Sequence, residues 1–377
     1  MSDRSIKFSA VGDITLGDHP LCVGFGAYSR FQKEEPLFPF LKSLEALQRS
    51  ELLFGNLECS HSNLGLKKND YNSVQMRGDP RHIQALVSAG FKVVNVANNH
   101  SLQHGKETFQ DSVDALQRNN IAICGLAADQ TATSAKPVII NRNGLSVGFL
   151  GYSLRPRQYF EHVPLYAEGG AEAMERDVLA LRKQADAVIV SVHWGEEFIQ
   201  RPSPEEINIA RRLVDAGADV IIGHHPHVLR GIEQHGRGYI VYSLGNFVCD
   251  MVWDDTLRTS LIFECTLTKN GIQDVNLVPT YTNANYQPEV LTGEKAKAVL
   301  VRLDRLEKDI PAVQKADIAA ANRDYMQDAD FVHRHIRAKS HRFFLYRFWK
   351  YPAPILMQQL VTYFKNRLHE RFVAHGQ

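Results

Sequence analysis

Short apolar segments alternate with helical patterns between residues 5 and 250, and this alternation constrains the fold more than any other feature. Helices are predicted at 80–90, 107–120, 171–185 and 203–217, the last with a capping box of Ser203 and Glu206. Strands that alternate with helices indicate an α/β fold. The strand-like segments are 6–12, 50–56, 91–99, 121–125, 145–153, 185–195, 218–225 and 238–247.

The sequence changes character after residue 256. Residues 259–281 predict a hairpin that turns at Lys269-Asn270-Gly271. After Asn285 only helical patterns are predicted, beginning with 294–310. We therefore expect a domain over residues 1–285 and a helical, basic and aromatic extension over residues 286–377.

Polar side chains of the kinds that bind metal follow most of the predicted strands, at the end where open α/β sheets bind ligands. Taken singly, such residues are more often caps, turn formers or core histidines. Their recurrence after five or six strands indicates a divalent metal site, since carboxylate, amide oxygen and imidazole are its usual ligands. The residues are Asp13, Asn56, Glu58, Asn98, Asn99, His100, His193, His225, His227 and Asn246.

The stretch VIIGHHPHV, residues 220–228, places three histidines directly after one predicted strand. Pro226 biases His225 toward an extended backbone. In an extended chain residues two apart point to the same side, so His225 and His227 are expected to converge. Neutral imidazole is the commonest metal ligand in proteins, which favours a metal ion as their common partner. The alternative is a polar turn with solvated histidines.

Six motifs occur in the order VGDITLG, GNLE, NNHSLQHG, HWGEEF, GHHPHV and YSLGNF. In this order the chain resembles the poly-gamma-glutamate capsule-synthesis (CapA) family, which is itself similar to the calcineurin-like metallophosphoesterases. The resemblance extends from residue 5 to about residue 280. It implies a four-layer α/β/β/α sandwich of metallophosphoesterase type, followed here by a C-terminal helical extension.

The resemblance also implies roles for individual residues. One or two divalent ions (Mn, Zn or Fe) would be held at one sheet end, with Asn99 and His100 in catalytic positions and with Asn246 and His224 supporting the ligands. Glu196, from its position beyond a strand end, is expected to support a histidine ligand, and its alternative is a surface acid. In the related phosphoesterases a histidine stands at the position of Thr15, and CapA-like proteins often have an aspartate at the position of Gln103. Both differences put a two-metal site in doubt. The implied ligands are Asp13, Asn56 or Glu58, His193, His225 and His227.

Two functions of different class follow from the resemblance. The first is a metal-dependent hydrolase of capsule, exopolysaccharide or poly-gamma-glutamate biosynthesis, acting on an anionic polymer or a phosphoester. The second is a non-catalytic component that binds the polymer or its synthase and has a degenerate metal site. The histidines of GHHPHV and HWG favour the enzyme, whereas Thr15 favours the binding component.

The C-terminal segment 331–377 differs from the rest of the chain in charge. It carries nine basic residues and one acid, so its net charge is +8, whereas the whole chain is at +1. Two interpretations stay open: the aromatic residues pack on the main domain with the bases as a solvated rim, or they contact an anionic membrane surface. No nucleic-acid partner is expected, because no reader motif appears. The aromatics are Phe343, Phe344, Tyr346, Phe348, Trp349, Tyr351, Tyr363 and Phe364, with Pro352 and Pro354 dividing two helical halves.

The cysteines and the N-terminus predict the compartment. Five widely spaced cysteines without a CxxC pair favour buried thiols in a reducing environment. The residues before the first predicted strand contain no apolar run long enough for a signal peptide, and no apolar stretch approaches the roughly 18 residues of a spanning helix. We expect a cytoplasmic protein, or one held peripherally at the inner membrane face.

Overall fold

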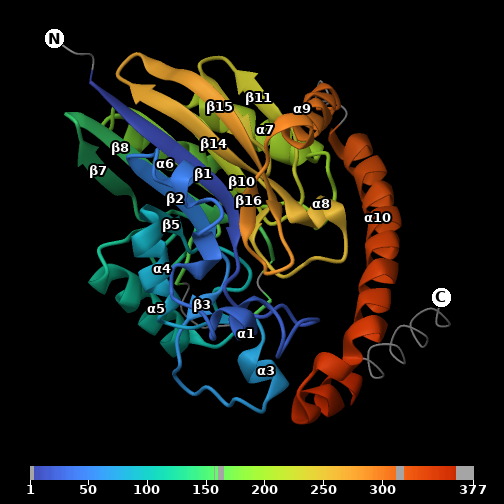
Figure 1. Ribbon diagram of the computed structural model, residues 1–377. Helices are drawn as coiled ribbons and strands as arrows, with labels where there is room; N and C mark the ends of the chain where they lie inside the picture. Colours follow the sequence, from blue (N-terminus) through green and yellow to red (C-terminus); the bar gives the residue numbers. More distant parts are fainter. Residues whose placement is uncertain (1–3, 157, 160–164, 311–317, 362–377) are drawn as a thin grey trace.

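A computed structural model describes residues 4–156, 158–159, 165–310 and 318–361. Within them two large β-sheets lie face to face, and helices cover the outer face of each sheet (Figure 1). The layers are therefore helix, sheet, sheet and helix, which confirms the predicted α/β/β/α sandwich.

The first sheet contains the N-terminal strand at its centre. Its order is β16-β15-β14-β1-β2-β5-β6, and β13 also pairs with β1. The strands β1, β2, β5, β6 and β13 run parallel, whereas β14, β15 and β16 are antiparallel to their neighbours. The bounds are β1 Ser5–Ile14, β2 Leu52–Leu57, β5 Phe91–Asn95, β6 Ala122–Cys124, β13 Asn246–Val248, β14 Thr259–Thr268, β15 Gly271–Thr282 and β16 Pro288–Val290.

The second sheet has the order β11-β12-β10-β9-β8-β7, in which β8, β9, β10 and β12 are parallel. Every residue of β9 and β10 is buried, as expected for parallel strands covered on both faces. A separate two-stranded ladder joins β3 (Ser60–His61) and β4 (Arg77–Gly78). The bounds are β7 Val138–Arg142, β8 Leu145–Ser153, β9 Ala187–His193, β10 Val220–His224, β11 Ile232–His235 and β12 Gly238–Val241.

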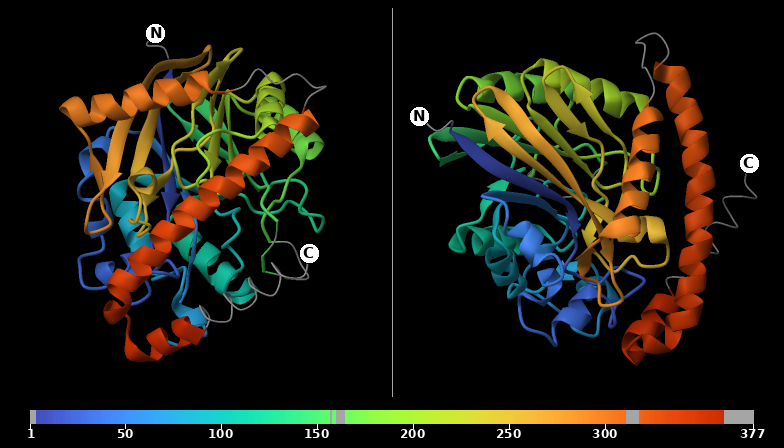
Figure 2. Two further views of the ribbon diagram at one scale, coloured as in Figure 1. Left: turned by 90° about the vertical axis from the view of Figure 1, so that its right-hand side faces the viewer. Right: turned by 45° about the horizontal axis from the view of Figure 1, so that its top comes forward.

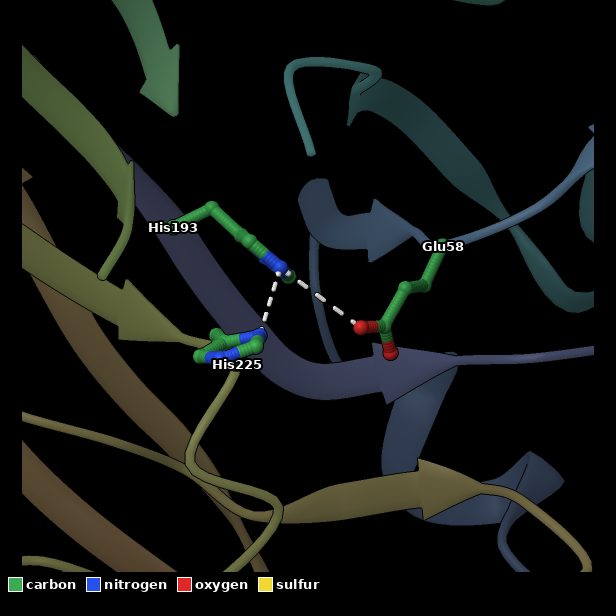
Figure 3. Close-up of side chains that lie close together, drawn as sticks. All are labelled: Glu58, His193 and His225. Carbon is green, nitrogen blue, oxygen red and sulfur yellow. Dashed lines mark hydrogen bonds and ion pairs between the residues drawn. The ribbon is translucent and has the colours of Figure 1, made fainter. Parts of the chain in front are cut away.

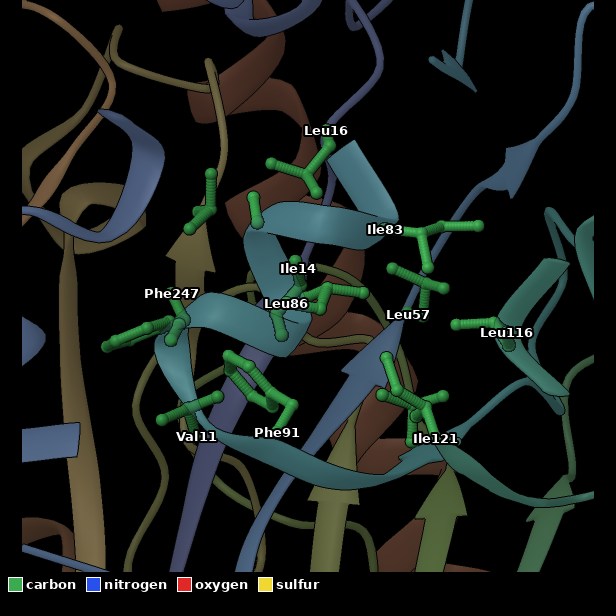
Figure 4. Packing of buried hydrophobic residues seen from close by; sticks show 14 of the residues in the cluster. Val11, Ile14, Leu16, Leu57, Ile83, Leu86, Phe91, Leu116, Ile121 and Phe247 are labelled. Carbon is green, nitrogen blue, oxygen red and sulfur yellow. The ribbon is translucent and has the colours of Figure 1, made fainter. Parts of the chain in front are cut away.

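Three apolar clusters hold the layers together. Between the sheets, the rings of Phe54 and Phe149 stack with centroids 6.0 Å apart. On the outer face of the first sheet, α4 (His82–Ala89) and α5 (Lys106–Arg118) bury their apolar sides (Figure 4). On the outer face of the second sheet, α6 (Ala171–Arg182) and α7 (Pro204–Asp215) do the same. The core is thus continuous from one helical layer to the other.

Local sequence accounts for the ends of these elements. Helix α7 begins at the predicted capping box, in which Ser203 and Glu206 bond each other's backbone N–H groups. The hairpin β14–β15 turns at Lys269 and Asn270, as predicted. Shorter helices fill the connections: α1 Ala27–Phe31, η1 Phe38–Phe40, α2 Leu44–Leu47, α3 Tyr71–Val74 and α8 Asp255–Arg258. All five cysteines are buried and free, in agreement with the prediction of buried thiols.

The expectation that only helices follow Asn285 is wrong. Strand β16 pairs with β15 beyond that residue, and its three residues beginning at Pro288 are too few to show a periodic pattern. The helices then follow as α9 (Gly293–Lys308), α10 (Ile318–Arg347) and η3 (Phe348–Lys350), and residues 353–361 are again helical after Pro352. The division into a domain and an extension stays a prediction.

Helix α10 runs along the side of the sandwich and packs on it (Figure 2). Phe343, Phe344 and Tyr351 are buried, whereas Tyr346 and Trp349 are 70 % and 63 % exposed. The interpretation that the aromatic residues pack on the main domain therefore holds for some of these residues. Tyr363 and Phe364, with the rest of the chain after 361, lie outside the described residues. Among the described helices, none has the length and apolarity needed to cross a bilayer.

Candidate metal centre

The carboxyl ends of four parallel strands, two from each sheet, bring the predicted residues together. In the first sheet Asp13 of β1 pairs in register with Asn56 of β2, and Glu58 follows directly. In the second sheet His193 of β9 pairs with His224 of β10, and His225 follows. Asp13, Glu58, His193, His225 and His227 are each 5 % exposed or less. The site is therefore a buried polar centre where the two sheets meet.

Three acceptor-type atoms from different elements surround Nε2 of His193. Asn99 Oδ1 lies at 2.7 Å, Nδ1 of His225 at 3.1 Å and Oε1 of Glu58 at 3.6 Å (Figure 3). A neutral imidazole can offer a single proton at this nitrogen, so it cannot satisfy all three. An amide oxygen, a carboxylate and two imidazoles around one point form the ligand set of a borderline divalent cation.

Asp13 is the most heavily bonded group of the centre. Its Oδ1 accepts from Asn56 Nδ2 at 2.9 Å and lies 3.1 Å from His224 Nδ1, and its Oδ2 accepts the backbone N–H of His225 at 3.2 Å. Burial alone raises the pKa of this carboxyl, but the hydrogen bond with His224 and the neighbouring imidazoles hold it below the usual range. Asp13 is therefore ionised, as a metal ligand must be.

Glu58 differs from Asp13, because its protonated form is favoured in the absence of a cation. Burial, followed by the charge of Asp13, raises its pKa well above the usual range. Its Oε1 is buried and accepts no hydrogen bond from the described residues, and the same holds for Nε2 of His225. Orphaned buried polar atoms of this kind are costly unless a ligand satisfies them. The residues present therefore fit a cation, which would stabilise the Glu58 carboxylate.

The cation could lie in any of three overlapping groups of ligand atoms, each group within 4.8 Å. The first is Glu58 with His193 and His225, the second is Asp13 with Glu58 and His227, and the third is Glu197 with His225 and His227. His227 is fixed by its Nδ1, which donates to Asn246 Oδ1 at 2.9 Å and leaves Nε2 available as a ligand. The shared members allow one ion or two adjacent ions.

The backbone of the GHHPHV stretch is not extended, which corrects the expectation from Pro226. His225 has φ of 91° and His227 has φ of 60°, both in the left-handed region. Strand β10 ends at His224, and the chain then turns sharply, with the N–H of His225 bonded to Asp13. The two rings nevertheless converge, with centroids 5.7 Å apart. Convergence thus comes from a strained turn and not from strand periodicity.

The two residues that depart from the related families each contact a predicted site residue. Thr15 donates a hydrogen bond to Oε2 of Glu58 at 3.4 Å, so it fixes this carboxylate where a histidine would add a ligand. Gln103 Oε1 accepts a hydrogen bond from Nδ1 of His100 at 2.8 Å. Burial lowers the pKa of His100, and the bond to Gln103 opposes this in part.

Several predicted residues hold the frame of the site. The amide of Asn56 bonds Asp13 and accepts from Asn95, and the side chain of Asn98 donates to the backbone carbonyl of Leu57. Asn246 donates to the carbonyl of Leu257 while it accepts from His227. These amide side chains thus fix the positions of the ligand residues and of the chain beside them.

The supporting role predicted for Glu196 stays a prediction, whereas its neighbour Glu197 belongs to a candidate ligand group. The Glu196 carboxylate forms an ion pair with Arg155 at 2.7 Å, whereas Glu197 joins the group with His225 and His227. Gly195 has φ of 76° and Phe198 φ of 68°, so the turn between them decides which acid faces inward. The two adjacent acids of HWGEEF were the available sequence signal for an acid near the site. Strand periodicity does not continue through such a turn, so it does not show which of the two acids faces the site.

The fold and this centre define a four-layer α/β sandwich protein with candidate ligands for a divalent metal from both sheets. The family model described as bacterial capsule synthesis protein PGA_cap matches residues 7–251. The chain is 31 % identical over 291 residues to the capsule biosynthesis protein CapA of Bacillus anthracis, covering 74 % of this chain and 67 % of the relative. This chain therefore belongs to the PGA_cap family of bacterial capsule synthesis proteins.

A second CapA protein agrees with this assignment. The PGA biosynthesis protein CapA of Bacillus subtilis (strain 168) is 31 % identical over 283 residues, which cover 74 % of this chain and 72 % of that protein. Among solved structures, a 5′-nucleotidase from Candida albicans aligns over 91 % of this chain and 59 % of its own length, with 12 % identity and a TM-score of 0.41.

Proposed function

We propose that this protein is a metal-dependent hydrolase that acts on an anionic polymer or a phosphoester in capsule or poly-gamma-glutamate biosynthesis. One observation carries the proposal: Nε2 of His193 is surrounded by Asn99, His225 and Glu58 within 3.6 Å in a buried centre that has orphaned ligand atoms. The relatives' names supply the biosynthetic setting.

We assign the ligands to Asp13, Glu58, His193, His225 and His227, which would hold Mn, Zn or Fe. When bound, such an ion supplies Lewis acidity and a water of lowered pKa. Asn99 Oδ1, which lies 2.7 Å from Nε2 of His193, would lie beside the ion, and His224 and Asn246 hold Asp13 and His227 in place.

His100 is assigned the proton transfer to the leaving oxygen. Its Nδ1 donates to Gln103, so Nε2 is the atom that gains and loses the proton. Burial lowers its pKa, which keeps the ring neutral in the free protein near pH 7. A bound anionic substrate favours the protonated form that the acid role requires.

The test is turnover of small chromogenic substrates. With Mn²⁺ supplied, the full-length protein should hydrolyse a nitrophenyl phosphodiester or phosphomonoester, and His100→Ala should lower the rate about 10²-fold or more. His335→Ala changes an exposed histidine on α10 and should leave the rate unchanged. Equal rates for the two variants would remove His100 from the mechanism.

The second candidate is the non-catalytic component that binds the polymer or its synthase. Thr15 and Gln103 favour it, because each contacts a site residue where a related family has a histidine or a carboxylate. No turnover across several ester and amide substrates and metals, together with saturable binding of polyglutamate, would replace the hydrolase by this function.

We also propose that the protein is cytoplasmic and contacts the inner membrane face through the end of α10. Leu345, Tyr346 and Trp349 are each more than 60 % exposed, and residues 331–361 contain several bases and no acid. Such a surface complements anionic lipid, because aromatic rings sit at headgroup level and each base contributes about 1 kcal/mol.

Vesicle sedimentation tests the membrane contact without removing the buried part of the helix. The full-length protein should pellet with anionic vesicles at low salt and should be released by salt. Tyr346→Ser with Trp349→Ser should abolish pelleting, whereas Phe331→Ser, which changes another exposed aromatic of α10, should not. Pelleting by neither the wild type nor the control would refute the contact.

A further inference from the structure

A cavity of about 260 Å³ lies between α10 and the loops that carry the metal centre. The sandwich contributes His19, Glu197, Phe198 and Trp253 to its lining, and α10 contributes His333 and Arg337. The cavity is therefore closed on one side by the catalytic loops and on the other by a helix that lies outside the family match, which ends at residue 251.

The cavity adjoins the candidate metal centre directly. Glu197, which lines it, also belongs to the ligand group with His225 and His227. The ring of Phe198 lies 6.3 Å from the ring of His227, and Nε2 of His333 bonds the backbone carbonyl of Glu197 at 2.9 Å. A molecule in the cavity would thus lie beside the ligands, with α10 covering it.

Helix α10 is held rigidly at both sides of the cavity. On the N-terminal side, Tyr325 bonds the buried guanidinium of Arg230 at 3.1 Å, and Arg230 pairs with Glu206 at 2.6 Å. On the C-terminal side, Lys339 pairs with the buried Asp254. Arg337 lies between these anchors, so its backbone position is fixed before any ligand arrives.

We propose that α10 forms the outer wall of the substrate pocket and that Arg337 binds an oxyanion of the substrate next to the scissile bond. This inference rests on the proposed function and names its substrate contact. A guanidinium binds carboxylate and phosphate through paired hydrogen bonds, and it keeps its charge at any physiological pH. The rings of His19 and Trp253, with centroids 5.0 Å apart and planes inclined by 57°, provide an angled aromatic wall for the uncharged part of the same molecule.

Two oxyanions fit this chemistry: the free carboxylate of an acidic polymer and the phosphate of an ester. Binding to the metal-loaded, full-length protein is measured by fluorescence, because Trp253 lines the cavity. Inorganic phosphate and polyglutamate are titrated separately, and Trp253→Phe should remove the signal. The probe that saturates identifies the source of the oxyanion.

Arg337→Gln should weaken binding of the saturating probe about tenfold or more, since it removes a charge-assisted hydrogen bond. Arg334→Gln changes an exposed arginine one turn away that does not line the cavity, and it should bind like the wild type. Both variants should keep the metal content of the wild type. Ser340→Phe should weaken binding without a change of charge, because Ser340 also lines the cavity and the larger ring fills it.

The outcomes separate this inference from the proposed hydrolase. Probe binding that depends on Arg337, in a protein that hydrolyses nothing, supports the pocket and refutes the hydrolase. Hydrolysis with unchanged KM and unchanged probe binding in both Arg337→Gln and Ser340→Phe overturns the pocket and leaves the hydrolase intact. If Arg337→Gln loses its fold, Ser340→Phe alone decides, with unchanged binding again overturning the proposal.

Discussion

At the scale of single residues, the centre combines strain with burial. His225 and His227 have left-handed backbone conformations, which cost non-glycine residues on the order of 1–3 kcal/mol each. These two backbone conformations cannot relax, because Asp13 holds the N–H of His225 and Asn246 holds the ring of His227. Strain maintained in this way is typical of functional sites, and here it turns two imidazoles toward one point.

Gln103→Glu should raise the pKa of His100. The new carboxylate would accept from Nδ1 at the place of the amide oxygen, and its charge would stabilise the protonated ring. The part of the pH–rate profile that requires protonated His100 should therefore move to higher pH.

The control for this change is Gln110→Glu, which adds the same charge at an exposed position of α5. The titration of His100 can be followed directly by NMR of its ring protons. An identical His100 pKa in Gln103→Glu and Gln110→Glu would show that Gln103 does not control this ring.

At the scale of elements, the sequence predicts what depends on neighbours along the chain. The alternation of segments predicts the strands and helices, Ser203 and Glu206 predict the start of α7, and Asn270 predicts the turn of the hairpin. The three-residue strand β16 and the inward turn of Glu197 were missed. Both depend on contacts with residues distant in sequence, which no local pattern records.

The docking of α10 could not be predicted for the same reason. Its aromatic residues alternate between buried and exposed positions, and only the folded surface of the sandwich decides which are covered. The ligand residues were easier to predict from the sequence, because parallel strands of an α/β fold bring their carboxyl ends to one edge of the sheet. Which atom faces the ion was not predictable, since it depends on side-chain amides such as Asn56 and Asn246.

Arg230→Met should lower the free energy of unfolding by about 3–5 kcal/mol, because it leaves the Glu206 carboxylate buried without its partner. Arg212→Met breaks a half-exposed pair with Glu175 and should cost about 1 kcal/mol or less. Urea denaturation of both variants gives the comparison. Equal losses would show that the buried pair of Arg230 and Glu206 stabilises the fold no more than the half-exposed pair.

At the scale of the whole molecule, the structure contains a pH-sensitive contact outside the candidate ligand groups. Asp250 accepts the N–H groups of His19 and Ala27, and the nearby Asp18 accepts those of Gly24 and Ser29. Burial, followed by the charge of Asp18, raises the pKa of Asp250 from 3.8 to about 8. Burial raises the pKa of Asp18 to about 6.

The folded protein therefore binds a proton at Asp250 that the unfolded chain releases above pH 3.8. Stability from this proton is complete below the unfolded pKa and is lost as the pH rises through the folded value of about 8. As the pH rises from 6 to 9, the free energy of unfolding should fall less in Asp250→Asn than in the wild type. Urea denaturation at each pH measures this difference. Asp304→Asn, at an exposed position of α9, should follow the wild type. Parallel curves for all three proteins would contradict the raised pKa.

The metal centre also joins the two halves of the molecule, since Asp13 and Glu58 come from the first sheet and His193 and His225 from the second. The central claim is that these side chains hold a divalent ion, and elemental analysis of purified full-length protein tests it most directly. The wild type should carry about one equivalent or more of Mn, Zn or Fe. His225→Ala with His227→Ala should carry almost none, and His235→Ala, at a half-buried histidine paired with Asp215, should carry as much as the wild type. Circular dichroism confirms that each variant is folded. An unchanged metal content in the folded double variant would contradict the assignment of the site.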